Sequence, residues 1–280
     1  MLNLPKDEDG QGQLFNHAGQ FEDGQGKIRA GKATITVALD GSGDAETIQE
    51  GLKMLPSTGG TVYIKEGIYH ITSNIEINKS NTLVEGAGKA TQIHINANAT
   101  QIYINAVSYC TLRKIYIKTD VGNAPSIVVE AATHTTIQDL WIEDSADSGI
   151  YVMSSGEDFK IQNCTIIDSA LYGIELDDCQ RVQITNCYIY DAVQAIVGAY
   201  IKNSIVANNI IRTIANEAID LIGAGCDGNI IIGNMFLSLS NDAVWIEDVG
   251  AVKNVIVGNS LIGYVIDDDG TGTVTSGNAT

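Results

Sequence analysis

The spacing of apolar residues near the start of the chain predicts a short amphipathic helix. In the segment DAETIQEGLKMLP, Asp44 is a suitable N-cap, and Pro56 cannot continue a helix. Between them, apolar residues recur at helical spacing, at Ile48, Leu52 and Leu55. We therefore expect a helix over residues 45–55 that buries these three side chains. The following segment, GGTVYIKEGIYHI, alternates apolar and polar residues around Gly67, which is typical of two short strands and a tight turn.

A longer period begins near residue 100. Seven phrases share one pattern of apolar and polar positions: TLRKIYI, TIQDLWI, KIQNCTI, QITNCYI, IVANNII, IIIGNMF and IVGNSLI. They align at Lys114, Asp139, Asn163, Asn186, Asn208, Asn234 and Asn259, which lie 22–26 residues apart. About ten residues after each of the first six aligned positions a second apolar phrase follows, such as GIYV or AIDL. The chain therefore contains an internal repeat with several short strands per unit.

A repeat of this length predicts an all-β solenoid, the parallel β-helix, in which strands of consecutive coils stack about 4.8 Å apart. Leucine-rich repeats are the competing solenoid, but this chain lacks their leucine framework. Residues one period apart then stack in columns. Each column can be interpreted as a surface or as a layer of the core.

The segment DAETIQEGLKMLPSTGGTVYIKEGIYHI, followed by NTLVEGAG, resembles the N-terminal cap of the pectate-lyase-like superfamily of right-handed parallel β-helix proteins. The resemblance extends over roughly residues 34–275. It implies a single-stranded right-handed β-helix with a polar N-terminal tail or docking segment (1–33), a cap with the helix (34–99) and coils of 22–26 residues (100–280). We expect the tail to pack on the body or on a partner subunit.

The superfamily includes polysaccharide lyases and hydrolases, alginate epimerases and phage tailspike depolymerases, so the resemblance implies a role with polysaccharides without selecting one. The Gly-Asp-Asp and Gly-His-Gly signatures of polygalacturonases are absent, as is the epimerase pattern Tyr-Gly-x-Asp-Pro-His. Arg212 has no basic companion of the kind that a lyase base with calcium would need.

The aligned asparagines are expected at sharp bends, because Asn tolerates the left-handed conformation and stacked amides can bond between coils. The next position should point inward, at Leu140, Cys164, Cys187, Asn209 and Met235. Cys164 and Cys187 would then be neighbouring buried thiols, an interpretation favoured over a disulfide.

One residue further lies an outward stripe that is mostly large and apolar: Tyr116, Trp141, Thr165, Tyr188, Ile210, Phe236 and Leu261. It could stack sugars, lie beneath the tail or join subunits. Ile210 and Leu261 stack poorly on sugars, so we favour an oligomer interface, expected in a trimer, made by Tyr116, Trp141, Tyr188, Ile210, Phe236 and Leu261.

The neighbouring face carries carboxylates and aromatic residues, the mixture that binds sugars. Thr119, Asp144, Asp168, Asp191 and Thr213 form one column, and the strand after it projects Val128, Tyr151, Glu175, Val197, Asp220, Trp245 and Ile266. We assign carbohydrate binding to Asp144, Tyr151, Tyr190, Arg212, Asp220 and Trp245. Asp168, Glu175 and Asp191 are the candidate catalytic acids, since stacked carboxylates match the spacing in glycosidases. A solvated acidic turn or a cation contact would give the same pattern.

The composition of the chain disfavours several classes of binding partner. The net charge is −18, from 16 basic and 34 acidic residues, which disfavours nucleic acid, anionic lipid and acidic polysaccharide. No apolar run is long enough to span a membrane, and the first residues lack the pattern of a secretory signal. The five cysteines show no CxxC, which favours a reducing compartment during folding.

No cofactor is expected. The four histidines (His17, His70, His94 and His134) are assigned to different columns by this alignment, so we expect no histidine metal site. The run Asp267, Asp268 and Asp269 could bind Ca²⁺, but we favour a solvated turn.

Three functions remain. The first is a virion-associated or extracellular tailspike-like β-helix that recognises a surface polysaccharide. The second is a polysaccharide lyase or glycoside hydrolase, and the third is a purely structural decoration or assembly protein.

Overall fold

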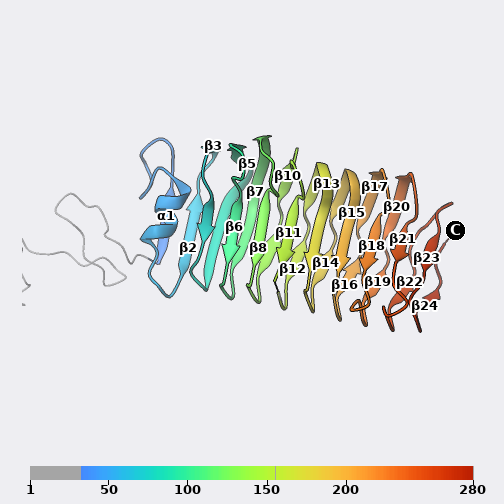
Figure 1. Ribbon diagram of the computed structural model, residues 1–280. Coiled ribbons are helices and arrows are strands. Elements are labelled where there is room, and N and C mark those ends of the chain that lie inside the picture. Colours follow the sequence, from blue (N-terminus) through green and yellow to red (C-terminus); the bar gives the residue numbers. More distant parts are fainter. Residues whose placement is uncertain (1–32, 155, 280) are drawn as a thin grey trace, which may run out of the picture.

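The computed structural model describes residues 33–154 and 156–279. The predicted tail over residues 1–33 lies outside them, apart from Ala33. The described chain winds into a right-handed parallel β-helix whose coils stack along one axis, from α1 at one end to β24 at the other (Figure 1). This confirms the predicted fold class. None of the helices in the described residues is long and apolar enough to cross a membrane.

Each coil contributes strands to three parallel stacks. The first stack contains β1 (Thr34–Val37), β2 (Gly60–Ile64), the start of β5 (Thr82–Asn96), the start of β7 (Thr111–Val121), β9 (Thr136–Gln138), β12 (Lys160–Gln162), β14 (Gln183–Thr185), β16 (Ile205–Ala207), β19 (Ile230–Ile232), β22 (Val255–Val257) and β24 (Val274–Ser276).

The second stack contains β3 (Gly67–Ile71), the later parts of β5 and β7, β10 (Trp141–Glu143), the starts of β13 (Thr165–Asp177) and β15 (Tyr188–Ala199), β17 (Ile210–Ile214) and β20 (Met235–Leu239). The third stack contains β4 (Ile75–Ile77), β6 (Ile102–Asn105), β8 (Ile127–Glu130), β11 (Ile150–Met153), the ends of β13 and β15, β18 (Ile219–Ile222), β21 (Val244–Ile246) and β23 (Ile266–Asp268).

The helix α1 (Ile48–Met54) covers the first coil and packs against β1, β2 and β4. Its N-cap is Thr47 rather than Asp44, because Thr47 and Glu50 form a reciprocal capping box with bonds of 3.2 and 3.3 Å. Asp44 instead accepts the Thr36 backbone N–H at 2.8 Å. The predicted apolar face is confirmed, since Ile48, Leu52 and Leu55 are all buried.

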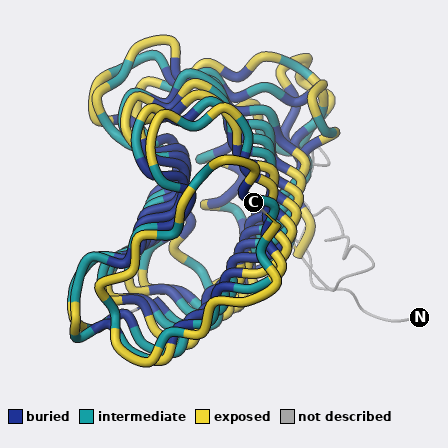
Figure 2. Tube along the Cα trace, turned by 90° about the vertical axis from the view of Figure 1, so that its right-hand side faces the viewer, coloured by how far each residue is buried: buried dark blue, intermediate teal, exposed yellow. Residues whose placement is uncertain are grey.

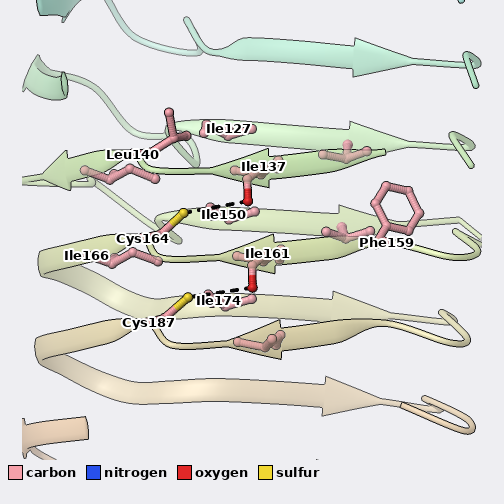
Figure 3. Packing of buried hydrophobic residues seen from close by; sticks show 14 of the residues in the cluster. Ile127, Ile137, Leu140, Ile150, Phe159, Ile161, Cys164, Ile166, Ile174 and Cys187 are labelled. Carbon is pink, nitrogen blue, oxygen red and sulfur yellow. Dashed lines mark hydrogen bonds between the residues drawn. The ribbon is translucent and has the colours of Figure 1, made fainter. Parts of the chain in front are cut away.

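The core is built from columns of aliphatic side chains, which appear as repeating buried positions along the coils in Figure 2. Cys164 and Cys187 lie in one such column, and both thiols are buried and free, as predicted. Their Sγ atoms donate to the carbonyls of Ile137 and Ile161, at 3.8 and 3.7 Å (Figure 3).

The bend column differs from the predicted alignment in its last two coils. Thr185, Ala207, Ile232 and Val257 pair in register, so Asn208 is followed by Gly233 and Gly258, not by Asn234 and Asn259. All of these bend residues have a left-handed φ between 55° and 68°, and Asn and Gly are the residues that adopt it most readily. The sequence phrases contain Asn-Asn or Gly-Asn pairs, and alignment on the wrong Asn shifts the register by one.

This shift corrects several side-chain orientations. Phe236 and Leu261, predicted at an oligomer interface, are core residues with exposures of 0% and 3%. Met235, predicted to point inward, is 43% exposed and takes the outward position, and Ser260 pairs with it in the next coil. Asp267, and not Ile266 as predicted, pairs with Trp245 in the outward column of the third stack.

Asn234 and Asn259 instead join Asn209 in a buried amide ladder. The Oδ1 atom of Asn234 accepts the backbone N–H and the side-chain N–H of Asn209, at 2.9 and 3.0 Å. Its own Nδ2 donates to Val206 O at 2.9 Å and to Asn259 Oδ1 at 3.0 Å. The ladder therefore satisfies buried backbone groups at the corner between the first two stacks.

Candidate functional site

A cleft of about 470 Å³ lies on the outward side of the third stack. Its floor consists of outward residues of successive strands: Tyr103, Val128, Tyr151 and Glu175. Its wall comes from the segment that precedes each of these strands: Gln101, Pro125, Asp147, Leu171 and Tyr172. Glu130 and Met153 complete the lining. We call this cleft the acidic groove.

Tyrosines and carboxylates line the acidic groove together. The Tyr103 hydroxyl donates to Glu130, which raises the pKa of Tyr103 to about 12. Ser148 Oγ donates to Glu175 Oε2 at 2.7 Å. Burial raises the pKa of Glu175 above its ordinary value, against the opposing effect of Ser148. Glu175 is therefore a carboxyl group that binds its proton more tightly than an exposed glutamate does.

A second group of polar residues continues the same face, two coils further along. Glu175, Val197, Asp220 and Trp245 pair in register in consecutive coils. Gln194 Nε2 donates to Asp220 Oδ2 at 2.7 Å and to Glu217 Oε2 at 2.9 Å. We call Gln194, Glu217, Asp220 and Trp245 the buried polar cluster.

Asp220 is 2% exposed although it projects outward from its strand. Its Oδ1 atom and the Nε1 atom of Trp245 are both buried and have no hydrogen-bond partner among the described residues. The pKa of Asp220 is raised to about 7, chiefly by burial and to a smaller extent by Glu247 and Glu217, against the opposing effect of the bond from Gln194. Asp220 Oδ1 is an acceptor and Trp245 Nε1 is a donor, and they lie on adjacent coils. One hydroxyl group, which can donate one hydrogen bond and accept another, would satisfy both atoms.

The raised pKa of Asp220 predicts a pH-dependent contribution to stability. The folded state holds the proton more tightly than the unfolded state does, so the stabilisation is complete below about pH 4 and is lost as the pH rises to about 7. Asp220→Asn stays neutral and should gain roughly 4 kcal/mol relative to wild type between pH 4 and pH 8. Urea unfolding of both proteins at these two pH values measures the difference. An equal difference at both values would mean that Asp220 titrates normally.

The column of Asp144, Asp168 and Asp191 lies apart from the acidic groove and shares no lining residue with it. These aspartates occupy the bend after the second stack, with φ between 57° and 58°. Asp144 forms an ion pair with Lys118 at 2.8 Å. Burial and the neighbouring Asp191 and Asp144 raise the pKa of Asp168. Aspartate adopts this left-handed conformation more readily than most residues do, so the bend by itself accounts for aspartate at these three positions.

Tyr190 and Arg212 do not line the acidic groove either. They project from the second stack, where Arg212 lies 5.9 Å from the centre of the Tyr190 ring, and Tyr190 stacks on Tyr188 at 6.4 Å. The outward stripe continues on this face through Tyr116, Trp141 and Ile210. Of the predicted carbohydrate-binding residues, the structure thus brings together Tyr151, Asp220 and Trp245, along with the predicted acid Glu175.

Sequence reasoning did not identify six residues, because they lie before the first aligned phrase or between the phrases: Tyr103, Glu130, Asp147, Tyr172, Gln194 and Glu217. It also separated two histidines that belong together. His70 and His94 pair in register in adjacent coils, which corrects the expectation that the histidines share no column. Their spacing of 24 residues, one repeat length, was the available signal. Asp268, in the proposed calcium run, accepts the N–H of Gly270 at 2.9 Å, as in a solvated turn.

Comparison with known proteins gives the following matches. The family model described as "Right handed beta helix region" matches residues 125–280, and the model described as "Pectinesterase" matches residues 34–137. No curated protein sequence matches the chain.

Solved structures share the fold at low sequence identity. An alginate lyase from Paenibacillus sp. str. FPU-7 has a TM-score of 0.64 at 18% identity, over 88% of this chain and 94% of the other. ORF18 of Geobacillus virus E2 has a TM-score of 0.61 at 17% identity, over 88% of this chain. The Dettilon tailspike protein gp208 has a TM-score of 0.59 at 15% identity, over 81% of this chain. The matches span 60% of the Geobacillus virus protein and 50% of the tailspike.

Proposed function

Because the chain belongs to the family of right-handed β-helix regions, we propose that it binds a surface polysaccharide in the acidic groove. The observation that carries this proposal is the lining of the groove. Tyr103, Tyr151 and Tyr172 offer ring faces for sugar rings, and Glu130, Asp147 and Glu175 offer acceptors for hydroxyl groups. Trp245, the one residue of the buried polar cluster that is only partly buried, continues this surface along the axis of the coils.

We further propose that the polysaccharide is uncharged. The described lining of the groove contains three carboxylates and no lysine or arginine. A uronate polymer placed there would meet like charges, on a chain whose net charge is −18. The proposed substrate class therefore differs from the polymer after which the alginate lyase that shares the fold is named.

Screening the full chain against neutral and uronate-containing glycans tests this proposal. We expect saturable binding of at least one neutral polysaccharide and none of polygalacturonate or alginate in the absence of divalent cations. Binding confined to uronate polymers would overturn the choice of substrate class.

Binding of a surface polysaccharide is the function expected of a tailspike-like protein. A virion-associated or extracellular β-helix that recognises host polysaccharide is consistent with the likeness to a Geobacillus virus protein and to a tailspike. We propose that the outward stripe joins the subunits of a trimer, since Ile210 and Met235 are 41% and 43% exposed on adjacent coils. The corrected stripe keeps Tyr116, Trp141, Tyr188 and Ile210 and gains Met235.

Light scattering at micromolar concentration tests the trimer. Wild type should have three times the chain mass of 29.8 kDa, and Ile210→Asp should reduce it to one chain mass because a carboxylate would be buried at the interface. Val249→Asp, in the turn that follows β21 of the third stack and 71% exposed, serves as the matched control and should remain trimeric. A wild-type monomer would leave the stripe without an oligomeric role.

Glycoside hydrolysis is the second candidate function, and one observation favours it. Glu175 and Asp220 lie two coils apart in one column, at roughly 10 Å along the stack, near the upper limit for inverting hydrolases. Both carboxyl groups have raised pKa values, as a general acid requires. Digestion of a bound glycan, measured by new reducing ends, tests this function, and unsaturated products would indicate a lyase instead. Binding without either product would favour recognition or assembly alone.

A further inference from the structure

His70, His94 and Asp120 converge on the surface of the first coils, outside the acidic groove. Their potential ligand atoms all lie within 4.8 Å of one another. The rings of His70 and His94 are 5.4 Å apart and meet edge to face. The pair arises because parallel strands in register place equivalent side chains next to each other in adjacent coils.

A bulge brings the carboxylate to the histidines. In the pairing of β5 with β7, Ile95 pairs with Thr119, but Asn96 pairs with Val121, so Asp120 is the extra residue. Such a bulge redirects a side chain. Asp120 Oδ2 consequently lies 2.6 Å from His94 Nδ1. Lys118, which pairs with His94 in β7, forms an ion pair with Asp144 at 2.8 Å.

Polar side chains around the three residues hold them in place. Asn96 bridges the two sides, with its Oδ1 2.9 Å from His70 Nδ1 and its Nδ2 3.3 Å from Asp120 Oδ2. Gln92 Oε1 lies 3.2 Å from His94 Nε2. The side chains of His94 and Asp120 are 16% and 29% exposed, so an ion can reach them from solvent while their positions are restrained.

We propose that His70, His94 and Asp120 bind one divalent transition-metal ion of the zinc type. Two imidazole nitrogens and one carboxylate oxygen form the ligand set that zinc takes with an additional water molecule. The ion replaces the proton shared between His94 and Asp120, and small side-chain rotations bring the ligand atoms to zinc-binding distances. Because the three ligands come from β3, β5 and β7, the ion connects three consecutive coils at the end of the solenoid that carries α1.

Zinc titration of the tag-free full chain, followed by calorimetry, tests the site. We expect one Zn²⁺ per chain and affinity that falls at least about tenfold in His94→Ala and in His70→Gln. His134→Ala is the matched control, because His134 also lies near a carboxylate, at 3.5 Å from Asp158, and should leave binding unchanged. The absence of saturable zinc binding, or binding that survives both substitutions, would overturn the proposal.

Two further readouts separate the site from a folding defect. Co²⁺ bound to wild type should give the visible absorption of a tetrahedral complex, which His70→Gln, at an exposed position, removes without altering the far-UV circular dichroism. At a hundredfold excess over the dissociation constant, zinc should raise the melting temperature of wild type by roughly 5 °C and leave that of the variant unchanged. Equal shifts in both proteins would assign the zinc to other groups. Glycan binding in the acidic groove is independent of either outcome.

Discussion

Asn234→Ala should destabilise the protein by about 3 kcal/mol, more than any other single substitution considered in these coils. The truncation leaves two N–H groups of Asn209 without their acceptor and Val206 O without its donor. All of these atoms lie in the buried corner of the coil, where water does not replace the lost bonds. Because each coil stacks only on its neighbours, the defect weakens the contacts on both sides of it.

The thermal unfolding of Asn234→Ala, compared with that of the single variant Asn186→Gly, measures this effect. Asn186 occupies the exposed bend with a φ of 56°, a conformation that glycine adopts without strain, so its replacement should change stability by less than about 0.5 kcal/mol. The expected decrease in melting temperature for Asn234→Ala is roughly 10 °C. Equal melting temperatures for the two variants would mean that the ladder contributes nothing beyond the bend asparagines.

The period of the sequence predicted which residues share a column but not how deeply each one is buried. Tyr151, Glu175, Asp220 and Trp245 were correctly placed on one outward face, because parallel strands in register preserve the alternation of side chains. Asp220 is nevertheless buried, since the neighbouring connection contributes Gln194 and Glu217 above it. The segments that connect the strands differ in length and sequence from coil to coil. The repeat therefore does not predict which outward side chains these segments bury.

Two errors have a common physical origin. Asparagine suits both the left-handed bend and the buried ladder, so the Asn208–Asn209 and Gly233–Asn234 pairs allow two alignments that differ by one residue. Phe236 and Leu261 then exchange faces, because side chains alternate along a strand.

His70 and His94 were missed for a different reason. The cap was treated separately from the coils, whereas β3 and β5 already pair in register.

Tyr151→Ala should weaken polysaccharide binding about tenfold, or more if the ring stacks on a sugar in a fully desolvated subsite. Tyr151 lies on the floor of the acidic groove beside Glu175, and its loss removes one of the three tyrosine rings that line the groove. Trp245→Ala should have a comparable effect if the glycan extends over the buried polar cluster. Tyr190→Ala is the matched control, because Tyr190 is an aromatic residue of the same type on the second stack, outside the groove.

The central claim is that a neutral glycan binds in the acidic groove on the third stack. Calorimetric titration of one neutral oligosaccharide, identified by the glycan screen, into wild type, Tyr151→Ala and Tyr190→Ala tests it most directly. We expect the affinity for the oligosaccharide to fall at least about tenfold in Tyr151→Ala and to stay unchanged in Tyr190→Ala. Unchanged affinity in Tyr151→Ala, together with a loss in Tyr190→Ala, would contradict it and place the binding surface on the second stack.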